Sequence, residues 1–300
     1  MKPSIHALSA VLAISLVGCG GNVKTIEAFQ KSTDSLTGDY VKLADKIDEM
    51  CIEDALKTQL LSPQYNGPNE THVLNVVEQT CGGAKAAKKQ LRNAAVVLDS
   101  YVTALAQVAG LDVKVFDDDL KSLSEAVDGL KTRNDNRVFK ESEVSAAQSL
   151  AKFVSQEITS YFVKKEVSGA IKKNRESFNN LVNAIALHIK TTLPNQADAN
   201  YATNSEFAQA LYETGNADGL LIGERLPART AADVYNERAE ASKKAKEAAN
   251  KFDVAAKQLV KANDDLAVKY EALSKQEQLD SLKSLVKRAA EVRDAVRAVK

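Results

Sequence analysis

Tryptophan is absent from the sequence, and proline and glycine are scarce, with 5 and 13 residues in a chain of 300. All-β folds place many prolines and glycines in their turns, so this scarcity argues against them. The 40 basic and 40 acidic residues leave no net charge, and a chain without excess positive charge has no general attraction for nucleic acid. Hydrophobic residues make up 44% of the chain, which is the composition of a folded protein.

The sequence motifs of common catalytic and cofactor sites are also missing. There is no GxxxxGK[ST], GxGxxG, HExxH or GxSxG motif. Beyond residue 19 the histidines are His72 and His188, and the spacing gives neither of them the partners of a metal site. His188 falls among apolar residues and is interpreted as a core or boundary histidine. The aspartates at 117–119 favour a helix start, because they lack the alternating ligands of a calcium loop. We therefore predict that the protein is not an enzyme and holds no metal or cofactor.

The first 19 residues have the order of a secretory signal. A short basic leader precedes an apolar run of 11 residues at 7–17, which is too short to cross a bilayer as a helix. The sequence LVGC, which ends at Cys19, resembles the lipobox of bacterial lipoproteins. The resemblance implies cleavage before Cys19 and acyl chains such as palmitate on that residue, and two or three such chains suffice for stable anchoring. An ordinary signal peptide is the alternative.

The same resemblance implies a location. Asp after the lipidated cysteine marks inner-membrane retention in enterobacteria-like sorting, and this chain has Gly20 there. We expect a protein of the bacterial cell envelope, lipid-anchored in the outer membrane with its bundle in the periplasm, while surface exposure stays open. The expected partners are the membrane, through the N-terminal lipid, and an envelope protein that the sequence does not identify. Nucleic acid is not an expected partner.

Two cysteines remain beyond the lipobox, Cys51 and Cys81, in a compartment that permits disulfides. Each lies 15 residues from Asn66, within a segment at 62–69 that is rich in proline, glycine and asparagine and so predicts a turn. Two helices that fold back at this turn would bring the cysteines level. We predict a disulfide that staples a helical hairpin, with two separate buried thiols as the alternative.

Apolar residues at seven-residue spacing predict long helices. More than 100 residues separate Pro68 from Pro194 without a proline, so helices can run there unbroken. One helical pattern is expected from a polar turn at 133–137 to about Leu193, with Gly169 as its weak point. The heptad series are Phe29, Leu36, Leu43, Met50; Val77, Ala84, Leu91, Leu98, Leu105; and Ala245, Phe252, Leu259, Leu266, Leu273. We predict an all-α fold, an elongated antiparallel helical bundle with coiled-coil-like heptad packing.

The pattern divides the chain into four segments. These are a cleaved lipoprotein signal peptide (1–18), an N-terminal helical hairpin with long helices (19–193), an irregular insert with one short helix (194–229), and C-terminal long helices that pack on the same bundle (230–300). In the insert, a capping box at 203–206 opens the short helix, which ends near Gly215. A second capping box at 274–277 marks a kink or turn, so residues 230–300 form one helix or two.

Two kinds of function fit this sequence. The first is a non-enzymatic envelope lipoprotein that acts as a helical scaffold, spacer or protein-binding module. The second is a surface-exposed adhesin or a membrane-active, toxin-like bundle, for which the apolar triplet at 220–222 is the candidate tip. Basic clusters, such as the one at 85–92, are interpreted as solvated faces. A lipid contact, first of all at Tyr161 and Phe162, is the alternative.

The last residue, Lys300, ends a predicted helix. This ending resembles that of the major outer-membrane lipoprotein, whose terminal lysine is joined to peptidoglycan. The resemblance implies a covalent link between Lys300 and the cell wall.

Overall fold

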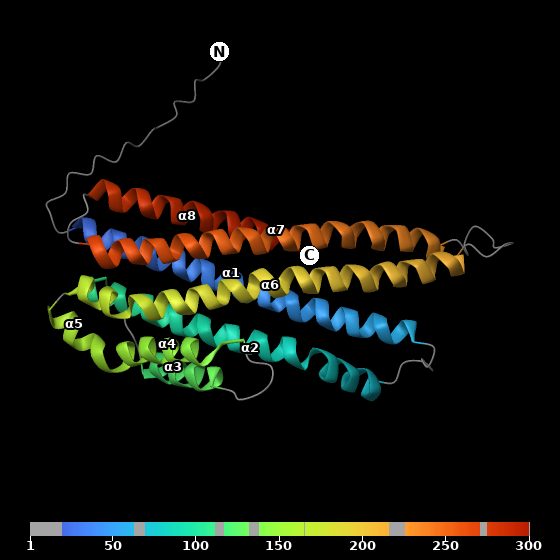
Figure 1. Ribbon diagram of the computed structural model, residues 1–300, viewed down its shortest axis with the longest axis horizontal. Helices are drawn as coiled ribbons and strands as arrows, with labels where there is room; N and C mark the ends of the chain where they lie inside the picture. The colour runs from blue at the N-terminus through green and yellow to red at the C-terminus, as the bar shows by residue number, and fades with distance from the viewer. Residues whose placement is uncertain are drawn as a thin grey trace, which may run out of the picture.

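Helices account for every regular element in the part of the chain that the structure, a computed structural model, describes. The described residues are 20–62, 70–111, 117–131, 138–164, 166–215, 226–270 and 275–299. Long helices lie alongside one another in both directions and form an elongated bundle (Figure 1). The predicted all-α helical bundle is therefore confirmed.

The frame of the bundle consists of long helices. They are α1 (Gly20–Leu61), α2 (Glu70–Val108), α6 (Val167–Gly215) and α7 (Leu226–Lys269). The 49 residues of α6 extend for about 74 Å at 1.5 Å per residue. A further helix, α8 (Lys275–Ala298), lies against both α7 and α1.

Shorter helices cover one side of this frame. They are α3 (Asp117–Leu130), α4 (Glu141–Lys152), the π-helix η1 (Phe153–Glu157) and α5 (Ile158–Lys164). These elements contact α2 and α6 (Figure 1). In η1 the backbone N–H of Ile158 donates to the carbonyl of Phe153, which is the wider turn of a π-helix.

The heptad positions supply the core. Phe29, Leu36, Leu43 and Met50 of α1 are buried, as are Leu91, Leu98 and Leu105 of α2. In α7 the alanines at 245, 248, 255 and 262 are at most 1% exposed. Their small side chains let α6 approach closely, and α6 and α7 form the most extensive helix pair of the bundle.

The expected helix end at Leu193, and with it the irregular insert from 194, is wrong. Helix α6 passes through Pro194 and continues to Gly215, so the capping box expected at 203–206 lies inside a helix. A proline in a helix interior costs about 3 kcal/mol. Leu193 and Ala197 are both buried in the bundle, and packing on both sides of the proline offsets that cost. The expected end near Gly215 is confirmed.

The other helix boundaries follow the sequence more closely. The long pattern expected up to Leu193 is divided, because α6 begins at Val167, two residues before the weak point predicted at Gly169. Helix α7 ends at Lys269 and α8 begins at Lys275, so the described residues of 230–300 form two helices. Helix α7 starts at Leu226, four residues earlier than expected. The turns predicted at 62–69 and 133–137 and the triplet at 220–222 lie largely or wholly outside the described residues.

No helix in the described part of the chain is both long enough and apolar enough to cross a membrane.

Candidate functional site: the disulfide-braced junction and the two ends of the bundle

The bundle has two distinct ends (Figure 1). The first, named here the α5 end, contains the start of α1, the end of α2, helix α5 and the end of α7. The second, named the hairpin end, contains the end of α1, the start of α2, the end of α6 and the start of α7. The half of the bundle nearer the hairpin end contains a disulfide and a cluster of polar side chains from three helices.

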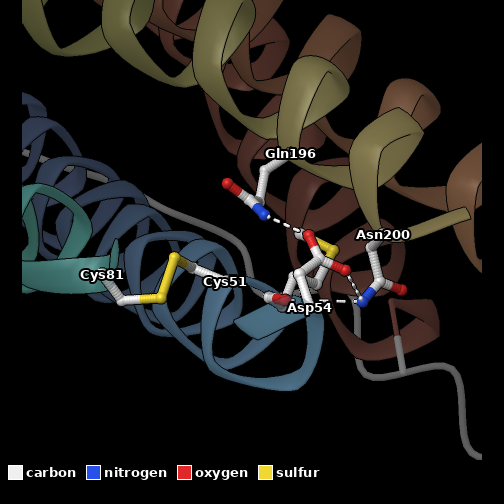
Figure 2. Close-up of a disulfide and its surroundings, with 6 residues drawn as sticks. Cys51, Asp54, Cys81, Gln196 and Asn200 are labelled. Carbon is white, nitrogen blue, oxygen red and sulfur yellow. Dashed lines mark hydrogen bonds between the residues drawn. A yellow bond between two sulfur atoms is a disulfide. The ribbon is translucent and has the colours of Figure 1, made fainter. Parts of the chain in front are cut away.

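A disulfide joins the first two helices in this half. Cys51 of α1 and Cys81 of α2 are bonded, with 5.8 Å between their Cα atoms (Figure 2). Both cysteines are buried and lie with Ala55, while Ile52 and Val77 pack around them half-buried. The predicted pairing is confirmed, and the two helices face each other at this level.

One turn beyond Cys51, the carboxylate of Asp54 receives two amide groups from α6. Gln196 Nε2 donates to Asp54 Oδ2 over 2.7 Å, and Asn200 Nδ2 donates to Oδ1 over 2.9 Å (Figure 2). Asn200 is buried and also donates to the carbonyl oxygen of Met50 over 3.4 Å. Burial raises the pKa of Asp54 to about 6, although both amide hydrogen bonds oppose the rise.

The neighbouring carboxylate, Glu53, binds cations instead. Arg238 of α7 lies 2.7 Å from Glu53 Oε1, and Lys57 Nζ lies 2.5 Å from the same atom. Lys57 also donates to the amide oxygen of Asn204 in α6. Burial alone would raise the pKa of Glu53, but Lys57 and Arg238 outweigh it and hold this pKa below its usual value. We name these residues the polar junction: Glu53, Asp54, Lys57, Gln196, Asn200, Asn204 and Arg238.

The polar junction fixes three helices against one another. Its side chains come from α1, α6 and α7, and each hydrogen bond has one preferred distance and direction. Sequence analysis missed it because residues 194–229 were expected to be irregular. The available signal was the spacing of Gln196, Asn200 and Asn204, which places three amides on one face of a helix.

A groove of about 420 Å³ lies beside the disulfide between α1 and α2. Three of the cations that line it are paired with acids. Lys85 lies 2.9 Å from Glu78, Lys88 lies 2.9 Å from Asp48, and Arg92 lies 2.8 Å from Asp45. This agrees with the interpretation of the cluster as a basic face complemented by neighbouring acids, and it leaves little uncompensated charge for an anionic ligand.

A second half-buried carboxylate, Asp99 of α2, lies in the other half of the bundle. Thr37 of α1 donates to Asp99 Oδ1 over 2.6 Å. Burial raises the pKa of Asp99 to about 7, and the nearby charge of Asp34 adds to the rise. Partial desolvation raises the pKa of Asp34, an exposed residue of α1, to about 6. The two acids therefore titrate closer to neutral pH than ordinary carboxyls do.

His188 is half-buried at the boundary of the core, which agrees with its prediction as a core or boundary histidine. Burial lowers its pKa, and its Nε2 atom finds no hydrogen-bond partner among the described residues. Within the same part of the chain, no three histidine, cysteine, aspartate or glutamate residues are grouped so as to hold a metal ion. The side chains of His72 and of the aspartates at 117–119 lie outside that part.

Comparison with models of protein families, with curated proteins and with solved structures gave no match. The function is therefore inferred from the sequence and the geometry of this protein. Two of the predicted site residues, Cys19 and Lys300, lie outside the described residues.

Eight of the eleven exposed large apolar side chains in the described part of the chain lie toward the two ends of the bundle, whereas Leu187, Val254 and Val286 lie away from them. At the α5 end the exposed side chains are Phe162, Val163 and Val268, and at the hairpin end they are Leu56, Leu60, Leu74, Tyr212 and Tyr235. Single exposed apolar residues are normal on a protein surface. Their clustering at the ends makes the ends the candidate contact surfaces of the molecule.

Proposed function

We propose that the chain is an acyl-anchored lipoprotein of the bacterial envelope, acting without catalysis as a rigid helical spacer that presents a protein-binding tip. In this proposal Cys19 carries the lipid and the hairpin end binds another envelope protein. The membrane is the outer membrane, and the bundle lies in the periplasm.

One observation carries the proposal most directly. Helix α1 begins at Gly20, the residue that follows Cys19, and continues for 42 residues to Leu61. This length corresponds to about 63 Å. A lipid on Cys19 would therefore be joined to the rigid bundle with almost no linker, and the far end of the helix would stand at a fixed distance from the membrane.

The structure of the hairpin end supports a binding role. Leu56 and Leu60 are one turn apart on α1 and share a face, and Leu74 lies on the paired helix α2. All three side chains are exposed. The disulfide and the polar junction hold the helices that carry them in register, so the surface is preformed, which lowers the entropy cost of binding.

Acylation is tested by replacing Cys19. In a bacterium that processes lipoproteins, the wild type should incorporate labelled palmitate and fractionate with outer membranes, whereas Cys19→Ala should do neither. The matched control is the double variant Cys51→Ala and Cys81→Ala, which removes two cysteines but should keep both label and location. A wild type that remains unlabelled and still fractionates with membranes contradicts the anchor.

Partner binding is tested by photocrosslinking from single positions in intact cells. A photoreactive residue at Leu60 should give a discrete adduct with another protein. The same residue at Leu187, a 57% exposed position in the middle of α6, should give none. Equal adducts from both positions contradict a specific tip.

The runner-up function is a surface-exposed adhesin, which the exposed tyrosines Tyr212 and Tyr235 at the hairpin end favour. Protease added to intact cells decides between the two functions, because only a surface protein is digested. A bundle that survives until the outer membrane is opened supports the periplasmic spacer.

A cell-wall link at Lys300 is a further part of the proposal. It predicts that muramidase releases a ladder of slower-migrating species, and that this ladder vanishes when Lys300 is deleted. Complete extraction of the unmodified protein by boiling detergent contradicts the link.

A further inference from the structure

Helix α5 exposes two consecutive apolar side chains at its end. Phe162 is 47% exposed and Val163 is 76% exposed. Most large apolar residues of the bundle are buried, so two adjacent ones on the last turn of a short helix form a local apolar surface. Val268, near the end of α7, is also exposed at the α5 end.

A chain of aromatic contacts fixes this surface to the core. The ring of Tyr161 in α5 lies 5.6 Å from that of Phe153, and the ring of Phe153 lies 5.7 Å from that of Tyr101. Tyr101 contacts Phe178 at 5.5 Å, and Phe178 contacts Phe29 of α1 at 5.6 Å. Because Tyr161 packs toward this cluster, the exposed side chains that follow it in sequence are held on a rigid element.

The aromatic chain also gives the level of α5 along the bundle. Phe29 is nine residues after Gly20 in α1, which is about 14 Å along the helix axis. Helix α5 is joined through the rings to this level and ends at the same extremity of the bundle as the start of α1 (Figure 1). The exposed pair and the first turn of α1 therefore share one end of the molecule.

The attachment point proposed for the lipid is adjacent to that end. One residue spans at most about 3.6 Å, and Cys19 is the residue before α1 begins. Acyl chains on Cys19 would therefore enter a bilayer within a few Å of the first turn of α1. A bundle tethered so closely keeps the extremity that carries α5 near the lipid surface, where a second contact would fix its tilt.

We propose that the α5 end docks on the phospholipid bilayer, with Phe162 and Val163 inserted at the boundary between headgroups and acyl chains. Apolar side chains on a surface element commonly enter a bilayer to this depth. The inference rests on the acylation of Cys19 proposed above. It adds a second contact, which sets the tilt of the rod relative to the membrane and not only its attachment.

The absence of tryptophan from the chain gives a clean measurement. In a Phe162→Trp variant the new indole is the only tryptophan, and its fluorescence reports its own surroundings. The full acylated protein is inserted into vesicles of phosphatidylethanolamine and phosphatidylglycerol, with or without bromine atoms on the acyl chains. We expect emission at shorter wavelength with vesicles and severalfold stronger quenching with the brominated lipid.

The matched control is Tyr212→Trp. Tyr212 is 56% exposed, similar to Phe162, but it lies near the end of α6 at the hairpin end. Its tryptophan should not respond to bromine. Adding Val163→Asp to Phe162→Trp should abolish most of the quenching, because a charge at the boundary opposes insertion, while the acylated protein stays on the vesicles.

The mass of the N-terminal peptide separates the two proposals. If the protein is acylated and bound to vesicles but bromine quenches Phe162→Trp no more than Tyr212→Trp, docking is wrong and the anchor stands. A peptide without acyl chains overturns both. A wavelength shift that depends on protein density and not on bromine shows that a second copy of the chain covers Phe162, which also overturns bilayer docking.

Discussion

The two halves of the bundle are held together by different interactions. Near the α5 end, Phe29, Tyr101, Phe153 and Phe178 are fully buried and meet ring to ring at 5.5–5.7 Å. Near the hairpin end a disulfide and the polar junction link the helices. Apolar burial is strong but non-directional, whereas hydrogen bonds and covalent bonds have fixed geometry. The α5 half also has directional bonds, because Asn263 of α7 donates to Asn179 of α6 over 2.9 Å and Arg175 lies 2.6 Å from Asp264. Among the described residues the halves therefore differ in the aromatic cluster of the one and the disulfide of the other.

The two halves also differ in how fully their apolar side chains are buried. Beside the disulfide, Ile52 and Val77 are only half-buried, and Leu56 and Leu60 on the next turns are exposed. Fewer large apolar side chains are buried around the disulfide than around the aromatic cluster. The disulfide and the polar junction add bonds of fixed geometry between the helices in this half.

The largest expected effect comes from opening the aromatic cluster. Phe178→Ala should lower the free energy of unfolding by about 3–5 kcal/mol, because it leaves a cavity beside the rings of Phe29 and Tyr101. Phe162→Ala is the matched control, since the same atoms are removed from an exposed site, and it should change stability by less than about 0.5 kcal/mol. Denaturant unfolding of the purified protein measures both free energies, and similar losses would show that the aromatic cluster has no special role.

Removing the disulfide should have a smaller and more local effect. The double variant Cys51→Ala and Cys81→Ala opens a loop closed by cysteines 30 residues apart, which should cost about 3–4 kcal/mol on the chain-entropy model. Hydrogen exchange should accelerate first in the hairpin half of α1 and α2, while amides around Tyr101 stay protected. Uniform acceleration along both helices would contradict the division into halves.

Shortening Asn200, at the centre of the polar junction, should lower the free energy of unfolding by less than removing the disulfide does. Asn200→Ala removes the amide donor from the carboxylates of Asp54 and Glu53, and such losses cost about 1–3 kcal/mol. Gln209→Ala, at an exposed position on the same helix, should stay within about 0.5 kcal/mol. Thermal unfolding compares the two variants. An Asn200→Ala variant as stable as the control would show that the polar junction does not contribute to stability.

The smallest expected effect depends on pH. The pKa of Asp99 rises from 3.8 to about 7 on folding, mainly through burial. Because the folded state holds this proton more tightly than the unfolded chain, the contribution of Asp99 to the free energy of unfolding is greatest below about pH 4. It is lost as the pH rises through about 7. Asp99→Asn, which keeps an acceptor for Thr37, should match the wild type at pH 4 and exceed it by about 1–2 kcal/mol at pH 8. Denaturant midpoints at both pH values test this. A difference between variant and wild type that is the same at pH 4 and pH 8 would show that the substitution acts through packing and not through titration.

Much of the fold could be predicted from local patterns. Heptads at Phe29, Leu36 and Leu43 predict a buried helix face, because 3.6-residue periodicity is a property of the segment alone. The disulfide was predictable because Cys51 and Cys81 are symmetric about one strong turn signal. Both features need only sequence distances within a single hairpin.

What could not be predicted depends on contacts between distant segments. Whether Pro194 ends a helix is decided by the burial of Leu193 and Ala197 against helices elsewhere in the chain. The partners of Asp54 lie more than 140 residues away, and no spacing rule links such positions. The contact of Asp99 with Thr37 was missed for the same reason, since it comes from the meeting of α1 with α2.

The contact between the first and the last helices has a consequence for how the chain assembles. Helix α8 lies against α1, and Arg293 donates a hydrogen bond to Ser35, 258 residues earlier in the chain. A polypeptide is made from its N-terminus, so α1 exists long before the helix that completes its surroundings. The final closure of the bundle must therefore await the end of synthesis. A chain that stops before α8 would leave an apolar seam along α1 open, a feature by which quality-control factors could tell an unfinished molecule from a complete one.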